Sequence, residues 1–470
     1  MIGTRPTPSR WAALTVLCAG MLMIILDGTI VSVALPAIQA DLGFSTEGLA
    51  WTVNAYLVPL GGLLLLAGRL GDLLGRRRML LAGLVLFVLA SLLCGLAIDP
   101  AMLVAARFLQ GVSAAMASAV VLGMIVGLFP EPVERAKAMG VYAFVGAAGA
   151  STGLVLGGLL AQTVGWRWIF LVNVPIGVVA VVAARWTVAP EAGQRGRADV
   201  LGAALVTAGL MLGVFAIVDT SGPAVRVTVA VLAGLLLAAF VARQRRIAEP
   251  LVRLSIFRSR AVSGGNAVQL LMVAGMLGFQ FTGALYLQES LGYTPAQTGL
   301  AMLPIAVTIG VVSLAGSGRL IGRFGPRPVL LAGQVFVAAG LVLLAPDATG
   351  SYTADLLPSI VLFGVGGGLV LPAVTTVIMS DATPADAGLA SGLANTSQQV
   401  GGAVGVAVLA VLAAARTDGL VAAGVPAVAL TGGYHLAFLV SAGLLVLAAV
   451  LTLTVLAPPK RAARELAVVE

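Results

Sequence analysis

The chain alternates long apolar runs with short polar segments. A run of about 20 apolar residues is long enough to cross a bilayer as a helix. Fourteen such runs can be drawn, near 11–38, 51–68, 79–98, 101–128, 138–163, 168–186, 200–218, 227–243, 261–288, 297–318, 329–345, 353–379, 392–415 and 434–457. The pattern predicts an all-α polytopic membrane protein with fourteen transmembrane helices.

Composition and charge agree with this prediction. Hydrophobic residues make up 60% of the chain, charged residues 10%, and the mean hydropathy is +1.07, whereas soluble domains carry about 25% charged residues. With the N-terminus inside, all but four of the 27 basic residues fall on the cytoplasmic side, as the positive-inside rule requires. The exceptions are Arg107, Arg167, Arg226 and Arg416. We therefore expect both termini in the cytoplasm, and we assign the net charge of +8 to orientation and not to nucleic-acid binding.

A short basic sequence occurs twice. GRLGDLLGRRR covers Gly68–Arg78, and a related GRLIGRFGPR covers Gly318–Arg327, 250 residues later by the difference of the two starting positions (318 − 68). A repeat of this kind indicates a transporter built from two related halves. Two six-helix halves alone would give a shorter offset, and the surplus matches one helical hairpin.

The predicted organisation follows from this offset. The domains are a six-helix bundle at 1–186, an inserted two-helix hairpin with cytoplasmic linkers at 187–260, and a second six-helix bundle at 261–470. The linker after the hairpin carries Leu251, Leu254 and Phe257 at helical spacing. It is either an amphipathic segment on the membrane surface or a charged linker that obeys the orientation rule.

Several kinds of chemistry are excluded by residue types. The only lysines are Lys137 and Lys460, and neither belongs to a GxxxxGK[ST] phosphate-binding loop, so an ATPase of that kind is excluded. One histidine, His435, and two separated cysteines, Cys18 and Cys94, cannot build a zinc site or a haem attachment motif. We predict no enzyme activity, no metal and no cofactor, and transport would draw on an ion gradient.

Asp27 and Arg107 are the candidate chemical groups. Asp27 lies in the middle of the first span, where an aspartate costs about 2.5–3.5 kcal/mol and is functional by default. It either couples protons or substrate, or it only hydrogen-bonds a neighbouring helix. Arg107 begins the fourth span and stays charged, so it cannot carry the proton but can hold a carboxylate. Asp27 is its expected partner, the alternative being an arginine that snorkels from the helix end; Gln110 follows on the same span.

Five glycines line the fifth span: Gly140, Gly149, Gly153, Gly157 and Gly158. Three of them have GxxxGxxxG spacing, so their face accepts another helix at close range. Such a contact suits a gate between the two halves, although glycine faces are also common in ordinary membrane packing.

The repeated loop supplies a candidate conformational switch, consisting of Gly68, Asp72, Gly75, Arg76 and Arg77. Helix N-termini favour anions, so Asp72 can cap a neighbouring helix. If this contact forms in one conformation only, breaking it shifts the equilibrium between inward- and outward-facing states. The second copy has lost this acid, because Gly322 stands at the matching position.

Weaker signals mark a substrate cavity. Glu289 closes the ninth span, and Asn395 and Gln399 open the thirteenth. Together with Gln110 they are candidate cavity residues. Their alternatives are an interfacial outer-loop charge for Glu289 and hydrogen bonds between helices for the amides.

These motifs resemble those of a known family. GRLGDLLGRRR resembles motif A of the major facilitator superfamily, RFLQG its motif B, the five glycines its motif C, and LDGTIVSVALP its motif D1. With WRWIFLVNVPIG after the fifth span and an inserted helix pair, the whole chain is similar to the fourteen-helix drug:proton antiporters of the DHA2 family. One departure is that the Gly-Pro of motif C is Gly153-Leu154 here.

The resemblance implies a function and a role for each motif. It implies proton coupling through Asp27 and Arg107, switching through Asp72 and the arginines after it, and a fifth helix that blocks leak. We expect a proton-coupled antiporter that exports small amphipathic drugs or antibiotics by alternating access. The alternatives are a proton-coupled metabolite symporter and a non-transporting lipid-handling or sensor membrane protein.

The setting and partners follow from the same expectation. The partners are a small-molecule substrate, protons and the lipid bilayer, and a monomer is the default state. Two lysines among 27 basic residues leave 25 arginines (27 − 2), which is typical of a GC-rich bacterial genome. The expected location is therefore the bacterial inner membrane.

Overall fold

The computed structural model describes residues 9–45, 48–189, 198–218, 222–344, 351–381 and 387–456. These residues are mostly helical and contain no strand, which confirms the predicted all-α class. The N-terminal helices are α1 Arg10–Ile30, α2 Leu35–Leu42, α3 Trp51–Leu74, α4 Arg76–Gly95, α5 Pro100–Leu128, α6 Pro132–Thr163, α7 Trp168–Leu171 and α8 Asn173–Thr187. The expected hairpin is α9 Val200–Val218 and α10 Pro223–Arg246. The C-terminal helices are α11 Arg260–Leu285, α12 Pro295–Val311, α13 Gly318–Phe324, α14 Pro326–Leu343, α15 Leu357–Met379, α16 Ala387–Ala422 and α17 Ala429–Thr454.

In the described part of the chain, thirteen helical stretches are long and apolar enough to cross a membrane. The remaining predicted span lies in α6, where only Thr152–Thr163 counts as an apolar helix, and a shorter one. The count of fourteen therefore stays a prediction.

The second span is longer than the sequence pattern predicts. The expected helix at 51–68 runs to Leu74, so Gly68 and Asp72 lie in the last turns of α3 and not in a loop. Leucine and arginine are good helix formers and continue the helix past the last strongly apolar turn. The turn itself is Gly75, whose φ of 97° is in the region that favours glycine.

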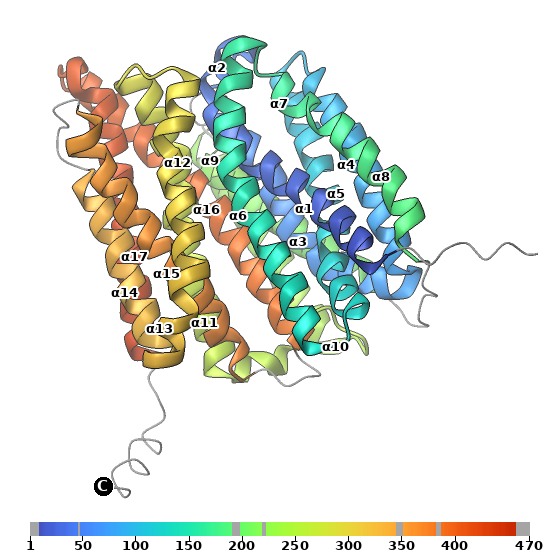
Figure 1. Ribbon diagram of the computed structural model, residues 1–470. Coiled ribbons are helices and arrows are strands. Elements are labelled where there is room, and N and C mark those ends of the chain that lie inside the picture. The colour runs from blue at the N-terminus through green and yellow to red at the C-terminus, as the bar shows by residue number, and fades with distance from the viewer. Residues whose placement is uncertain are drawn as a thin grey trace, which may run out of the picture.

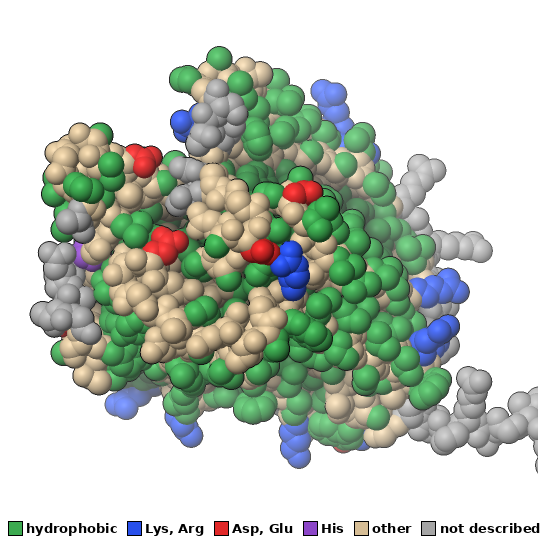
Figure 2. Space-filling model, turned by 90° about the horizontal axis from the view of Figure 1, so that it is seen from above, with side chains coloured by type: hydrophobic (Ala, Val, Ile, Leu, Met, Phe, Trp, Pro, Cys, Tyr) green, Lys and Arg blue, Asp and Glu red, His purple; other side chains and the backbone are tan. Residues whose placement is uncertain are grey.

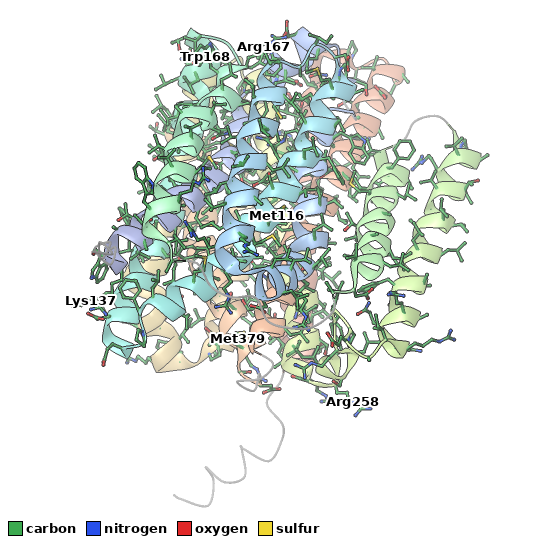
Figure 3. All side chains as sticks on the ribbon, turned by 90° about the vertical axis from the view of Figure 1, so that its right-hand side faces the viewer. Met116, Lys137, Arg167, Trp168, Arg258 and Met379 are labelled. Atoms are coloured by element: carbon green, nitrogen blue, oxygen red, sulfur yellow. The ribbon has the colours of Figure 1, made fainter. Side chains whose placement is uncertain are left out.

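The helices form two groups that face each other, α1–α8 on one side and α11–α17 on the other (Figure 1). The groups meet where α6 packs on α12 and α3 packs on α16. Helix α9 packs on α3 and α16, and α10 packs on α9 (Figure 3). Only 6% of the apolar window of α10 is buried inside the protein, so nearly the whole apolar surface of this helix faces outward.

The two ends of the molecule differ in charge. Arg167 and Trp168 lie at the end that carries α2 and α7, which we call the upper end, and Lys137 and Arg258 lie at the lower end (Figure 3). Seen from above, the upper end has acidic side chains near its middle, while Lys and Arg project mainly from the periphery (Figure 2). Lys137 and Arg258 thus share one end and Arg167 lies at the other, as the loop order predicted from the sequence requires.

Candidate functional site

Asp27 of α1 and Arg107 of α5 form an ion pair inside the N-terminal group of helices. Arg107 Nη1 donates to Asp27 Oδ2 at 2.5 Å. The two side chains are 0% and 1% exposed. The expected partnership is therefore present in the structure, and Arg107 does not snorkel to an interface.

Further hydrogen bonds connect the pair to its neighbours. Asp27 Oδ1 accepts from Gln110 Nε2 at 3.1 Å and from Asn173 Nδ2 at 2.8 Å. Arg107 donates from Nε to the Thr52 carbonyl and from Nη1 to Gln110 Oε1, both at 2.8 Å. A buried ion pair repays the cost of desolvation only when such additional hydrogen bonds are present. The network joins α1, α3, α5 and α8.

Three further side chains close around the network. Gln110 Nε2 also donates to Ser91 Oγ at 2.8 Å, and Cys94 Sγ donates to Gln110 Oε1 at 3.2 Å. The Arg107 guanidinium carbon lies 4.4 Å from the centre of the Tyr56 ring. Cys94, which nothing in the sequence separates from an ordinary packing residue, is therefore a neighbour of the ion pair.

The sequence prediction missed Asn173 and Tyr56. Asn173 stands in the apolar sequence LVNVPIG, and it is 0% exposed. An asparagine in an apolar run needs a polar partner when it is buried, and this signal was available. Tyr56 offered no such signal, because a single tyrosine in an apolar helix is most often an ordinary core residue.

A cavity of about 1140 Å³ lies between the two groups of helices. Asn395 and Gln399 line it, as the sequence predicts, together with Gln280 and Gln398. Gln110 belongs to the buried network and is not among the described residues that line the cavity. The inner wall also includes Thr29, Tyr56 and Tyr142.

Glu289 lies outside the cavity lining. It lies in the π-helical turn Tyr286–Ser290 that follows α11, and its Oε2 accepts from the Tyr434 hydroxyl at 2.6 Å. Of these predicted cavity residues, Asn395 and Gln399 therefore line the cavity and Glu289 does not.

The cavity reaches the surface at the lower end. Its rim includes Arg69 and Glu249, which form an ion pair at 2.7 Å with side chains 36% and 47% exposed. Asp199, another rim residue, accepts from Arg243 Nε at 2.7 Å and caps α9 through the Gly202 amide. Burial opposes ionisation of Asp199, but the hydrogen bonds from Arg243, Gly202 and Gln244 together hold its pKa below the ordinary value. The linker after the hairpin therefore forms part of the entrance.

The upper end is closed by backbone contact between α6 and α12. A Cβ atom at Gly158 would clash with the Pro295 carbonyl, and one at Gly299 would clash with the Leu154 carbonyl. Gln288 Nε2 also donates to the Val33 carbonyl at 3.0 Å. The described residues thus leave the cavity open at the lower end and seal it above.

Comparison with known proteins identifies the family. The family model for the Major Facilitator Superfamily matches residues 17–406. The chain belongs to the major facilitator superfamily. This confirms the resemblance drawn from the motifs, and it makes the chain a multi-pass transporter of small molecules and not an enzyme.

Relatives within the superfamily carry names that refer to export and resistance. The chain is 40% identical over 461 residues to puromycin resistance protein pur8 of Streptomyces alboniger, covering 95% of this chain and 91% of the relative. It is 39% identical to cephamycin export protein CmcT of Amycolatopsis lactamdurans, covering 88% and 87%. It is 36% identical to the tetracenomycin C resistance and export protein of Streptomyces glaucescens, covering 88% and 77%.

Solved structures share the superfamily fold. A bacterial homologue of the human lysosomal transporter Spinster, in an inward-facing and unoccupied conformation, gives a TM-score of 0.70 at 16% identity, covering 96% of this chain and 98% of that one. A point mutant of the nucleoside transporter NupG gives 0.68 at 12% identity, covering 94% and 99%. At these identities the likeness concerns the fold alone.

The superfamily motif A lies at the lower end of α3 and α4. Gly68 faces the cavity, and Asp72 accepts from Arg76 at 3.1 Å and 3.3 Å. Arg76 also donates to the Gly123 carbonyl of α5 at 3.3 Å, and Arg77 donates to the Arg185 carbonyl of α8 at 2.5 Å. In this conformation Asp72 is therefore held by an arginine of its own motif.

The motif C glycines divide into two sets. Side chains at Gly149, Gly153 and Gly157 would clash with residues of α1 and the turn after it, among them Leu22, Thr29 and Val33. The GxxxGxxxG face therefore packs on the helix that carries Asp27, inside the N-terminal group. Gly158 lies off this face and makes the contact with α12. Gly140 lies in the same helix, and its surroundings are outside the described residues.

No group of three or more His, Cys, Asp or Glu side chains suited to a metal ion occurs in the part of the chain that the structure describes. Cys18 and Cys94 are both buried and free. The chemistry of the described site therefore rests on the carboxylate, the guanidinium and the amides that surround them.

Proposed function

We propose that the chain is a proton-coupled antiporter that exports small amphipathic compounds, drugs or antibiotics, from the cytoplasm of a bacterium. The observation that carries this proposal is the sealed Asp27–Arg107 pair beside a large cavity that opens at one end. A buried carboxylate can accept a proton, which neutralises its charge, and intramembrane acids commonly serve proton relays.

The lower end is assigned to the cytoplasm. The basic residues that favour the inside lie there, including Lys137 and Arg258. On this assignment the structure is open to the cytoplasm and ready to accept substrate. The two terminal segments, 1–8 and 457–470, lie outside the described residues, so their cytoplasmic position remains part of the proposal.

The substrate class follows from the cavity wall. The described inner wall presents carboxamides and hydroxyls from Thr29, Tyr56, Gln280, Asn395 and Gln399, and the charged groups are confined to the rim. A wall of neutral donors and acceptors among apolar residues suits neutral or amphipathic molecules. The export names of the relatives agree with this class.

The energy source is adequate for export. Each elementary charge that crosses 100 mV contributes about 2.3 kcal/mol, which corresponds to about a fiftyfold gradient of a neutral substrate per proton. No cofactor is needed in such a cycle, and one chain contains both helix groups, so a monomer is sufficient.

The test uses inside-out vesicles that contain the full-length protein and a pH-sensitive dye. With a proton gradient imposed, adding puromycin or tetracenomycin C is expected to release protons, and Asp27→Asn is expected to abolish this release. Glu289→Gln is the matched control, because that acid lies outside the cavity lining. Release that persists in Asp27→Asn, or that is lost equally in Glu289→Gln, would remove Asp27 from the coupling role.

A further inference from the structure

We propose that the Tyr56 ring is the partition between the buried ion pair and the substrate cavity, and that it couples the protonation of Asp27 to the shape of the cavity. This inference rests on the proposed antiport function. It assigns a role to a residue that belongs to neither of the two charged groups.

Tyr56 is in contact with both compartments. It lines the cavity, although it is only 2% exposed. Its ring covers the Arg107 guanidinium at 4.4 Å. Of the described residues that line the cavity, none is Asp27 or Arg107. Tyr56 therefore lies between the Arg107 guanidinium and the cavity.

The position of the ring is fixed by three helices. The Tyr56 hydroxyl donates to the Ile24 carbonyl of α1 at 3.2 Å, one turn before Asp27. A methyl group at Gly28 would lie 3.9 Å from the ring. On α5, Gly111 approaches the Tyr56 carbonyl so closely that a Cβ atom there would clash. A shift of the ring thus requires movement between α1, α3 and α5.

The guanidinium explains why a ring is needed at this place. Its N–H groups lie in one plane, and in that plane they donate to Asp27, Gln110 and the Thr52 carbonyl. The faces of the group lie outside this plane of donors, and Tyr56 covers one of them. A cation is attracted to an aromatic face, most strongly when both are desolvated.

Proton uptake by Asp27 removes the negative charge that holds the Arg107 guanidinium in its present orientation. Arg107 remains charged, so its position and that of the stacked ring must adjust together. By reciprocity, a substrate that displaces Tyr56 from the cavity side changes the affinity of Asp27 for a proton. This is the coupling that antiport requires.

The native thiol of Cys94 allows the partition to be tested without a transport measurement. Cys94 is 0% exposed and donates to Gln110, so it lies in the compartment of the ion pair. The chain contains two cysteines. Replacing Cys18 by alanine in the full-length protein leaves Cys94 as the single thiol, and methyl methanethiosulfonate labelling is followed by intact mass.

Tyr56→Leu removes the aromatic face and is expected to raise the labelling rate of Cys94 by about tenfold or more, since the desolvated stacking contact is lost. Tyr56→Met, which keeps a long flexible side chain, provides a second variant if the leucine variant does not fold. Tyr56→Phe keeps the ring and is expected to stay near the rate of the parent protein. Tyr142→Leu is the matched control, because Tyr142 lines the cavity from α6.

Transport gives the second readout. Tyr56→Leu is expected to dissipate an imposed pH gradient without substrate and to flatten the pH profile of export, and Tyr56→Phe is expected to restore both. Unchanged labelling, an equal rise in Tyr142→Leu, or an unchanged pH profile would each overturn the proposal. If the unmodified protein moves no protons while Cys94 labelling still follows Tyr56, the coupling role is overturned together with proton antiport, and the partition alone stands.

Discussion

The two halves of the transporter share a helix pattern but not a chemistry. In the N-terminal half a fully buried ion pair is held by additional hydrogen bonds from Thr52, Gln110 and Asn173 on α3, α5 and α8. The buried polar residues described in the C-terminal half are all neutral, such as Asn266, Gln269 and Gln334. The amides that line the cavity, Gln280, Asn395, Gln398 and Gln399, come from the C-terminal half. The buried ion pair thus lies in the N-terminal half, and the described amides of the cavity wall lie in the C-terminal half.

The same division is visible in the repeated motif. Gly75 and Gly325 are equivalent turns, with φ of 97° and 80°. A side chain at Gly71 would clash with Val120, while Gly318 and Gly322 have nothing within 4 Å. The glycine turn of the repeat is kept in both halves, but only the N-terminal copy carries an acid, because Gly322 stands at the position that matches Asp72. Four substitutions test how far this difference extends.

Breaking the buried pair is expected to have the largest effect. Arg107→Met leaves Asp27 buried without its charge partner, which costs about 3–5 kcal/mol. Gln334→Leu removes one hydrogen bond to Thr452, which also bonds the Ala448 carbonyl, so we expect only about 1 kcal/mol. Denaturant titration in detergent measures both.

The double variant Asp27→Asn with Arg107→Gln refines this result. It removes both charges and is expected to recover most of the stability while proton-driven export stays lost. Equal costs for Arg107→Met and Gln334→Leu would mean that the two halves do not differ as described.

The second-largest effect is expected from opening the contact between α6 and α12 at the upper end. Gly158→Val forces a side chain against Pro295 and Ala296 of α12. Overpacking of this kind costs about 1–3 kcal/mol, enough to shift a conformational equilibrium about 5- to 150-fold away from the closed upper end. Spin-label distances between the upper ends of α6 and α12 would show the shift. Gly322→Val, placed in open space, is expected to leave the distances unchanged, and a similar response in both would contradict a specific contact at Gly158.

The sequence predicted the helices and the motifs well because both depend on local composition. Apolar runs, Gly75 and the position of Asp27 need no knowledge of neighbours. It also identified Arg107 as the partner of Asp27, since an isolated charge within a bilayer needs an opposite one.

What the sequence did not predict depends on the direction in which side chains point. Gln110 and Asn395 are both amides in apolar helices, yet one turns into the ion-pair network and the other into the cavity. The sequence left open whether the glycine face of α6 forms a gate between the halves or an ordinary helix contact. The face packs on α1, and Gly158 alone of the described motif C glycines reaches α12. Tyr56 gains its importance only from the arginine that lies against it. Helix rotation decides all three, and the apolar pattern of a helix buried on most sides does not determine rotation.

Asp72→Asn should have a smaller effect on the stability of the protein than on its rate of transport. The Asp72–Arg76 pair is about one-third exposed on each side, and such pairs contribute about 0–1 kcal/mol. If Asp72 exchanges Arg76 for another partner when the lower end closes, the substitution slows transport severalfold and leaves substrate binding intact. Stopped-flow export and equilibrium binding separate the two effects, with Gly322→Ala as the control in the copy that lacks the acid. A binding defect as large as the loss of rate would count against a switching role.

The smallest loss of stability is expected at Asp41–Arg167, which is, like Asp27–Arg107, an aspartate–arginine pair in the N-terminal half. Asp41 Oδ2 accepts from Arg167 at 2.5 Å and from the Trp166 indole at 3.0 Å, and these bonds lower the pKa of Asp41. A lowered pKa means that the stabilisation is fully present above the ordinary value of 3.8 and is lost as pH falls through the lowered pKa. The Asp41 and Arg167 side chains are 45% and 40% exposed, so water screens the pair. Asp41→Asn should therefore lower the unfolding midpoint slightly at neutral pH and not at all in strong acid. An effect comparable to that of Arg107→Met would show that the number of charges in the N-terminal half, and not their burial, distinguishes it from the C-terminal half.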